Sequence, residues 1–325
     1  MICSTIIPTI GRATLSRAVN SVLNQEFDRG EFEVIVVNDS GNPLAPEDWM
    51  RSPCVKMLNT KRRNRSVARN TGAAVAQGRY LHFLDDDDWM LPGAFKHLME
   101  VAKTTQAAWV YGSFHLVDHT GKLLSEIAPT DADNCFIQMV ASEWIPLQAS
   151  WIESEGFFAA GGFASLYSLS GGYEDIDLSR KIARYHQFAR CPEAVACIRY
   201  GDTGSTTDYN NLIVQNRQSR ENCLEMPGAF GRMLTSAQAS LNRTAYWHGK
   251  IVYYYLASIR WNLKQNRLTK ASSRAVFCLL AFPASGRHLL SREFWRGIGR
   301  PHINLVRTTV GAAEVDLYRN TTWRS

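Results

Sequence analysis

Hydrophobic and polar positions at the start of the chain follow two different patterns. Residues 2–7 and 32–37 are nearly continuous apolar runs, which predict two short buried strands. Between them, apolar residues recur every three or four positions and share one helical face: Leu15, Ala18, Val19, Val22 and Leu23. The pattern predicts a strand, a helix and a second strand in succession.

The same alternation continues to residue 84. Residues 54–58 and 80–84 predict two further strands, and residues 66–77 predict the helix between them. Strands separated by helices imply an α/β fold with a mostly parallel, Rossmann-like sheet flanked by helices. Ligands of such sheets bind outside the carboxyl ends of the strands. Asp39 and Asp85 both follow predicted strands at these ends.

More strands are predicted in the middle of the chain. Residues 109–117 are strand-like, and the turn residues at 119–121 suggest a hairpin or a meander at the sheet edge. Residues 147–152 are another strand candidate, and residues 174–185 have the apolar spacing of a helix. These elements would extend the sheet and cover it.

Strand signals cease near residue 210. Residues 246–265 and 268–282 carry aromatic and aliphatic side chains at helical spacing. We therefore predict an α/β domain over residues 1–210, followed by a helical C-terminal region over residues 211–325.

Composition is that of a folded, moderately basic protein. Hydrophobic residues make up 45% and charged residues 20% of the 325, with a formal net charge of +6. The seven cysteines are scattered without a C-x-x-C pair, so a reducing cytoplasm is the expected compartment. We expect no signal peptide, and the longest late apolar run, 275–283, is far below the roughly 20 residues of a membrane span.

Four consecutive carboxylates, Asp85 to Asp88, directly follow a predicted buried strand. Such crowding is repulsive unless a cation relieves it. Residues two apart in an extended segment face the same side, so Asp85 and Asp87 can converge on one hard divalent cation, Mg²⁺ or Mn²⁺, while Asp86 points away. A solvated acidic turn is the alternative, and the position at a strand end favours the metal site.

A basic segment, residues 61–69, precedes and opens the helix predicted at 66–77. Cationic side chains and a helix N-terminus together suit a diphosphate. Arg69 is the candidate ligand in this segment. Arg62, Arg63 and Arg65 are expected to face solvent.

Carboxylates also fill the first turn of the helix predicted at 174–185, after a Gly-rich loop. Helix capping alone would explain them. The alternative is a general base, since a carboxylate in a transfer enzyme can accept the proton of an acceptor hydroxyl.

Six motifs occur in order over the first two thirds of the chain. They are S-T-I-I-P-T at 4–9, V-I-V-V-N-D-S-G at 34–41, A-R-N-T-G-A-A at 68–74, F-L-D-D-D-D-W-M-L-P at 83–92, G-G-F at 161–163 and E-D-I-D-L at 174–178. Together they resemble the family 2 glycosyltransferases of the GT-A fold, and six motifs in family order are far more specific than any one of them.

The resemblance implies an inverting transfer from a nucleotide-diphosphate sugar, most commonly a UDP-sugar, to a glycan or lipid-linked acceptor. It also assigns roles to particular residues. The donor site would comprise Thr9, Asn38, Asp39, Arg69 and Asp86. Asp85 and Asp87 would hold the divalent cation, Mn²⁺ or Mg²⁺, and Asp175 would be the general base.

The chain departs from the family pattern at two places. Many relatives have Asp-Asp where this chain has Asn38-Asp39, which leaves open which of the two contacts the base. Many also carry a metal-binding His in an Arg-x-His string, where this chain reads Arg199-Tyr200-Gly201-Asp202. Asp202 or a water could take that ligand position.

Two other functions remain as alternatives. A nucleotidyltransferase would normally have a Gly-rich phosphate loop after the first strand, but residues 8–12 contain a single glycine. A non-catalytic scaffold that binds a sugar nucleotide or glycan is the other alternative, and the retained Asp85, Asp87 and Asp175 argue against it. Nucleic-acid binding is not indicated, because the basic residues form no stripe with interleaved aromatics.

The predicted C-terminal helices combine aromatic residues with Lys and Arg. The aromatics are Trp247, Tyr253, Tyr254, Tyr255, Trp261 and Phe277. They could pack these helices on the catalytic domain, which is the usual role of aromatics at helical spacing. The other interpretation is peripheral association with an anionic membrane at the cytoplasmic face, since aromatic rings and cations both favour that interface.

Overall fold

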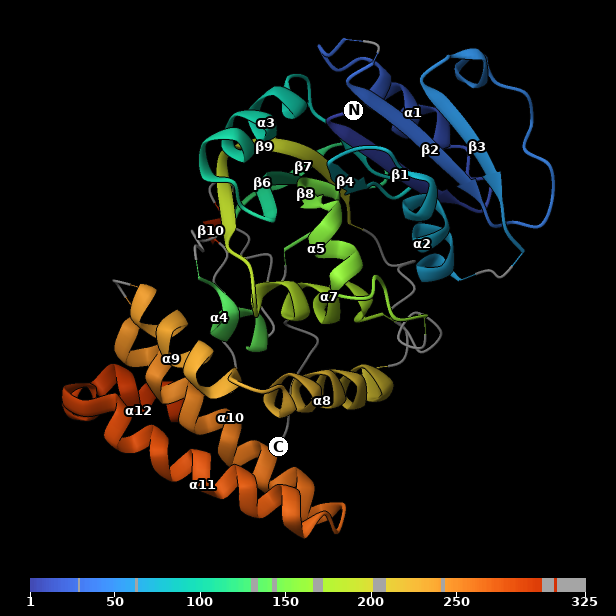
Figure 1. Ribbon diagram of the computed structural model, residues 1–325. Coiled ribbons are helices and arrows are strands. Elements are labelled where there is room, and N and C mark those ends of the chain that lie inside the picture. The colour runs from blue at the N-terminus through green and yellow to red at the C-terminus, as the bar shows by residue number, and fades with distance from the viewer. Residues whose placement is uncertain are drawn as a thin grey trace.

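The computed structural model describes residues 1–28, 30–61, 64–129, 134–141, 145–165, 172–200, 209–240, 243–299 and 307–308. In this part of the chain a single mixed sheet lies at one end and a group of helices at the other (Figure 1). The predicted α/β class with a helical C-terminal region is therefore confirmed.

The first half of the sheet is parallel, as predicted. Its strands lie in the order β3-β2-β1-β4, with parallel pairing throughout. Their bounds are Cys3–Thr9 for β1, Phe32–Asn38 for β2, Val55–Asn59 for β3 and Tyr80–Phe83 for β4. Helices α1 (Leu15–Leu23) and α2 (Arg65–Val75) and the short η1 (Asp48–Arg51) connect them. All four strands therefore end at the same edge.

The second half of the sheet is largely antiparallel. Strand β8 (Ser150–Glu153) joins the halves, because it pairs antiparallel with both β4 and β6 (Trp109–Val117). The predicted hairpin is present as β6 and β7 (Leu123–Ala128). The remaining strands are β5 (Trp89–Met90), β9 (Phe188–Arg199), which runs parallel to β6, and β10 (Arg307–Thr308). The strand predicted at 147–152 begins instead as a 3-10 turn, η2 (Leu147–Ala149).

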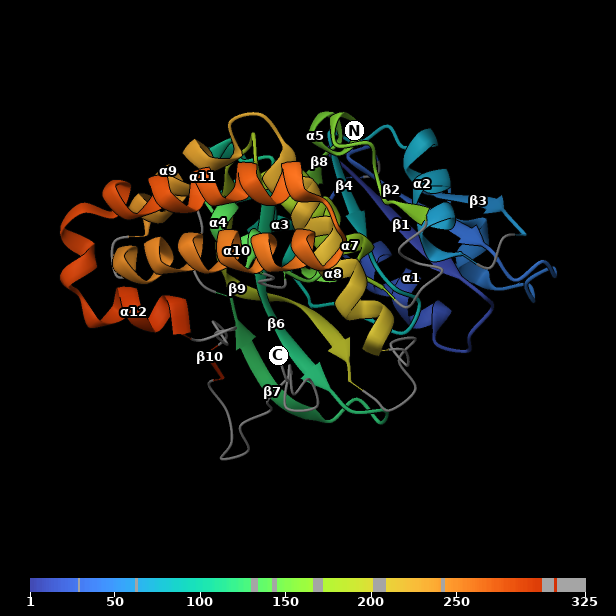
Figure 2. The ribbon, with the colours of Figure 1, turned by 90° about the horizontal axis from the view of Figure 1, so that it is seen from below.

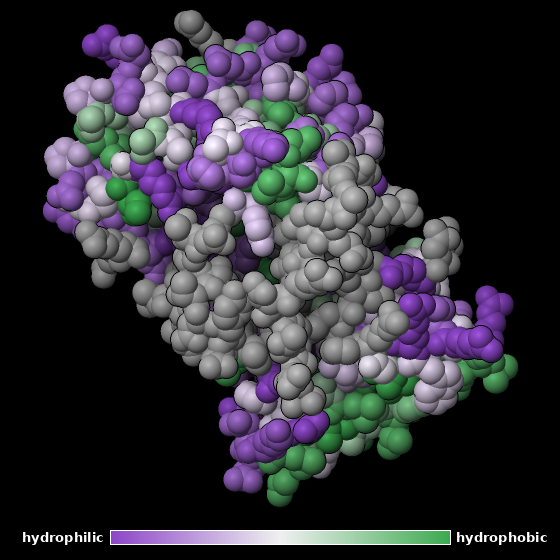
Figure 3. Space-filling model, turned by 180° about the vertical axis from the view of Figure 1, so that it is seen from behind, coloured by the Kyte–Doolittle hydropathy of each residue, from purple (hydrophilic) through white to green (hydrophobic). Residues whose placement is uncertain are grey.

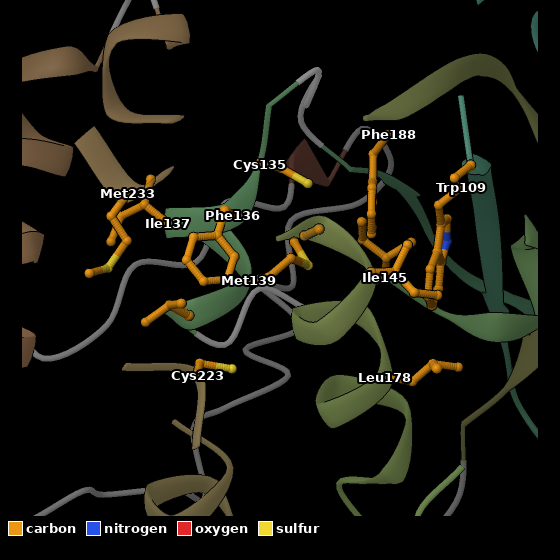
Figure 4. Close-up of a cluster of buried hydrophobic side chains, with 14 of the residues drawn as sticks. Trp109, Cys135, Phe136, Ile137, Met139, Ile145, Leu178, Phe188, Cys223 and Met233 are labelled. Carbon is orange, nitrogen blue, oxygen red and sulfur yellow. The ribbon is translucent and has the colours of Figure 1, made fainter. Parts of the chain in front are cut away.

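Helices cover both faces of the sheet and enclose two apolar clusters. One face carries α3 (Ala94–Thr105), with Phe95 packed edge-on against Trp151. The opposite face of the sheet is covered by α4 (Phe136–Val140), α5 (Ser154–Ala159) and α7 (Glu174–Ala183). Figure 4 shows part of this second cluster, in which Trp109 stacks on Phe188 while Leu178 approaches from α7. The core thus fixes α7 to the sheet.

The C-terminal helices continue this second core. They are α8 (Tyr209–Glu225), α9 (Ala229–Ala239), α10 (Thr244–Lys264), α11 (Leu268–Ser285), η3 (Gly286–Leu290) and α12 (Arg292–Gly299). Figure 2 shows α10 and α11 side by side on the face seen from below. Tyr254 and Tyr255 of α10 are buried in the same cluster as Phe136. Among the described helices, none has both the length and the apolarity to cross a membrane.

Candidate active site

The candidate site lies where β1, β2 and β4 end. Thr9 is the last residue of β1, and its Oγ1 donates a hydrogen bond to Oδ2 of Asp86 at 2.5 Å. Asn38 ends β2, and the backbone N–H of Asp39 donates to the carbonyl of Thr9 at 2.8 Å. The parallel register thus brings together residues that lie far apart in the sequence.

Residues 85–88 form a tight turn in which burial alternates. The N–H of Asp88 donates to the carbonyl of Asp85 at 3.1 Å. Asp86 and Asp88 are buried, whereas the side chains of Asp85 and Asp87 are 33% and 31% exposed. Asp85 and Asp87 are therefore the two carboxylates of this turn that a ligand from solvent can reach. The segment is a turn and not the extended segment that the spacing argument assumed, and Asp86 shares the guanidinium of Arg12 with Asp87.

Arg69 reaches this turn from α2. The helix lies close to the sheet because residue 72 is glycine: a Cβ there would lie 2.5 Å from Cγ2 of Ile6. The buried Arg69 donates from Nη2 to Oδ1 of Asp85 at 2.6 Å. Burial disfavours the charged forms of both groups, but their mutual attraction outweighs it, so the pKa of Asp85 is lowered and that of Arg69 is raised.

Glu174, the first residue of α7, joins the same charge network. Its buried carboxylate accepts from Nη1 of Arg69 at 3.1 Å and forms an ion pair with Arg65. Arg65 was expected to face solvent, and the structure corrects this, because α7 packs beside the start of α2 and supplies a buried partner. Arg62 and Arg63 lie outside the described residues. These ion pairs link the turn at residues 85–88, which is the candidate metal site, to the helix that carries Asp175.

Asp175 follows Glu174 on the first turn of α7. Its Oδ1 accepts from the N–H of Ile176 at 2.8 Å. Burial raises the pKa of Asp175, and the neighbouring charge of Glu174 raises it further, against the opposing influence of Arg65 and Arg69. A carboxylate with a raised pKa holds a proton more readily, which suits a group that must accept one.

Asn38 is held by the loop that follows β2, and Asp39 is held by the loop that leads to α2. Nδ2 of Asn38 donates to the carbonyl of Asn42 at 2.6 Å. The carboxylate of Asp39 accepts from Thr60 Oγ1 at 2.5 Å and from the N–H of Asn64 at 2.6 Å. Asn64 in turn caps α2 by accepting from Val67. Asp39 therefore joins the end of β2 to the helix of Arg69.

Sequence reasoning missed two residues of the site. Arg12 donates from Nη1 to Asp86 at 2.6 Å and lies 3.4 Å from Oδ2 of Asp87. Its position just after the first strand was the available signal. Gln148 donates from Nε2 to Oδ2 of Asp85 at 2.8 Å, and it comes from η2, where no motif marks it.

Residues 4–159 match the sequence family described as Glycosyl transferase family 2. This region is a family 2 glycosyltransferase domain. It contains β1, β2, β4 and the acidic turn, while Asp175 lies beyond its end.

Two curated relatives are each 31% identical to part of this chain. The poly(ribitol-phosphate) beta-N-acetylglucosaminyltransferase TarP of Staphylococcus aureus is 31% identical over 117 residues, 34% of this chain and 36% of TarP. The GalNAc(5)-diNAcBac-PP-undecaprenol beta-1,3-glucosyltransferase of Campylobacter jejuni is 31% identical over 136 residues, 38% of this chain and 41% of that protein. The matches thus span well under half of these relatives.

Solved structures are similar over most of this chain. The structure of S. aureus TarS residues 1–349 with UDP-GlcNAc covers 84% of this chain and 90% of that one, with a TM-score of 0.55 and 14% identity. The full TarS structure gives a TM-score of 0.57. At this identity the likeness establishes a shared fold.

The residues of the acidic turn fit a divalent cation that is shared with a diphosphate. Among the described residues, no group of three or more His, Cys, Asp or Glu side chains could hold a metal by itself. Mg²⁺ sites often use only one or two carboxylates, together with substrate phosphates and water. The pKa of Asp87 is raised by burial and by the charge of Asp85, a repulsion that a cation between them would relieve. Asp202, the alternative ligand, lies outside the described residues.

Proposed function

We propose that this glycosyltransferase moves a sugar from a nucleotide-diphosphate donor to a hydroxyl acceptor with inversion at the anomeric carbon. The observation that carries the proposal is the ion-pair network Asp85–Arg69–Glu174, which connects the acidic turn to the first turn of α7, where Asp175 lies. A displacement needs the leaving diphosphate and the base on either side of the sugar, and this network spans the two.

The donor lies across the ends of β1, β2 and β4 in this proposal. Thr9, Asn38 and Asp39 line the nucleoside end, and Asp86 lies on the ribose side. Arg69 turns from Asp85 toward the diphosphate, since a guanidinium can pair with phosphate in two hydrogen bonds. The nucleotide is UDP, the one bound in the TarS structures of the same fold.

Asp85 and Asp87 hold the divalent cation, Mn²⁺ or Mg²⁺, with oxygens of the diphosphate. When bound, the cation neutralises charge that develops on the leaving diphosphate. Gln148 keeps Asp85 in place through its hydrogen bond, and Arg69 does so before the donor binds. Arg12 does the same for Asp87 while also holding Asp86.

Asp175 removes the proton of the acceptor hydroxyl as its oxygen bonds to the anomeric carbon. The bond from that carbon to the diphosphate oxygen breaks at the same time, and the nucleoside diphosphate leaves with the bonding electrons. The acceptor is a glycan or a lipid-linked saccharide, and the reaction takes place in the cytoplasm. The seven cysteines include no C-x-x-C pair, which is in keeping with that compartment.

The test is release of nucleoside diphosphate across UDP-, GDP- and dTDP-sugars, with Mn²⁺, Mg²⁺ or chelator. We expect release with a UDP-sugar and metal, and its loss with chelator. A binding scaffold would bind the donor without releasing diphosphate under any condition, and a nucleotidyltransferase would instead release pyrophosphate from a nucleoside triphosphate. Either outcome would overturn the proposal.

A further inference from the structure

The C-terminal helices expose an apolar surface. Five large apolar side chains, here named the C-terminal apolar face, are between 48% and 91% exposed: Val276, Leu279, Leu280, Leu290 and Trp295. On α11, the first three lie three and four positions apart, opposite the buried Ala271, Cys278 and Ala281. Figure 3 shows a hydrophobic band along these helices, bordered by hydrophilic residues.

This surface is not made of the aromatic residues that suggested a membrane role in the sequence. Trp247, Tyr254 and Tyr255 are buried in the core, and the ring of Phe277 stacks on Tyr255. Tyr255 and Phe277 thus join α10 to α11, and the three buried rings belong to the same cluster as Phe136 of α4, which agrees with the interpretation that such rings pack these helices on the catalytic domain. The exposed side chains are aliphatic residues of α11 and η3, together with Trp295 of α12.

The same helices carry the positive charge of the chain. Residues 243–299 contain ten Lys and Arg but a single acidic residue, Glu293, which is a net charge of +9. The whole chain has +6, so the remaining residues sum to −3. The excess of positive charge is therefore confined to the C-terminal helices, which points to a negatively charged partner that binds this end of the molecule.

Exposed cations lie beside the apolar face. Arg287 in η3 and Arg292 at the start of α12 are exposed and lie within three residues of Leu290, the most exposed of the five. Arg296 is also exposed and pairs with Glu293 at 3.1 Å. In contrast, Arg274 is buried against Glu221 and Glu225 and belongs to the helix packing.

We propose that the C-terminal apolar face docks on the surface of an anionic lipid bilayer. The aliphatic side chains and Trp295 enter the boundary between headgroups and acyl chains, and Arg287 and Arg292 meet lipid phosphates. A second copy of this chain would place like charge against like charge at the same face. An acidic glycan would match the arginines and leave the apolar side chains exposed to water.

The test is co-sedimentation of the whole chain with vesicles of phosphatidylcholine alone or mixed with phosphatidylglycerol, at low and high salt. We expect pelleting only with phosphatidylglycerol, weakened by salt. Replacing Arg287 or Arg292 by Gln should lower the affinity roughly fivefold each, and the pair Leu279→Gln and Leu290→Gln should lower it at least about tenfold. Phe158→Gln is the control, because Phe158 is 52% exposed on α5 of the catalytic domain.

The proposal is overturned if no pelleting depends on phosphatidylglycerol at low salt, or if the Leu279 and Leu290 pair pellets like the parent. Light scattering in the absence of lipid identifies the competing partner: a dimer that the leucine pair dissociates would make this face a contact between copies. Pelleting requires no sugar donor. Failure here would therefore leave the proposed transfer reaction intact.

Discussion

Asp175 can be tested directly, because an amide keeps its shape and cannot accept a proton. We predict that Asp175→Asn binds the donor nearly as the parent does but loses about 10²- to 10⁴-fold in kcat. Donor titration and nucleotide release measure the two effects separately. Asp48→Asn, at a side chain fully exposed on η1, is the control. If Asp175→Asn turned over as fast as the parent, Asp175 would not be the general base.

Glu174 should influence Asp175 through charge. Glu174 raises the pKa of Asp175, so its removal should lower that pKa. The base works when deprotonated, and its rate falls as pH drops through the pKa. We therefore predict that Glu174→Gln moves the acidic limb of the pH–kcat profile to lower pH.

The loss of activity in Glu174→Gln should be smaller than in Asp175→Asn, because Gln can still accept a hydrogen bond from Arg69. Glu174→Asp, which keeps the charge, should leave the acidic limb close to that of the parent. An acidic limb that moves to higher pH in Glu174→Gln would contradict the assignment.

Asp85 and Asp87 should be needed for metal-dependent transfer. Asp85→Asn and Asp87→Asn each remove negative charge from the cation site, and we predict near-complete loss of nucleotide release at saturating Mn²⁺. Asp118→Asn, on the β6–β7 turn, is the control. Full activity of both site variants in chelator would mean that these carboxylates bind no catalytic metal.

At the scale of elements, α10 and α12 cross at two glycines. A Cβ at Gly249 would lie 2.0 Å from the carbonyl oxygen of Phe294, and one at Gly297 would lie 2.3 Å from that of Tyr246. The two backbones are therefore in direct contact, with no room for a side chain. This contact positions α12, which bears Trp295 and Arg292 of the proposed membrane surface.

We predict that Gly249→Ala destabilises the protein by about 1–3 kcal/mol, because the helices must separate. Gly231→Ala is the matched control, since Gly231 lies in helix α9 with open space around it and should gain about 0.5–1 kcal/mol. The midpoint of denaturant unfolding measures both. Equal stability of the two variants would show that α10 and α12 separate without cost.

Element prediction succeeded where the local period was unambiguous. The parallel strands β1 to β4 and helices α10 and α11 lie where apolar periodicity placed them, within about two residues at most boundaries. The strand predicted at 147–152 is only partly present, since Gln148 and Ala149 belong to a 3-10 turn that precedes β8. That turn carries Gln148, whose side chain donates to Asp85, a contact between distant segments that local periodicity does not reveal.

At the scale of the whole molecule, the sequence by itself determined the fold class and the candidate carboxylates. Alternating periods specify an α/β sheet, and a charge cluster at a strand end is visible without coordinates. The tertiary structure alone decided the partners of these groups. Arg65, Arg12 and Gln148 acquire their roles from elements that become neighbours only in the folded chain.

The C-terminal helices illustrate the same division. The sequence reveals both the excess of Lys and Arg and the helical spacing of apolar residues, but both faces of α11 are apolar in sequence. Packing against α10 buries Cys278 and Ala281 and leaves Leu279 and Leu280 in water. Burial depends on which surfaces meet, and local periodicity carries no information about that.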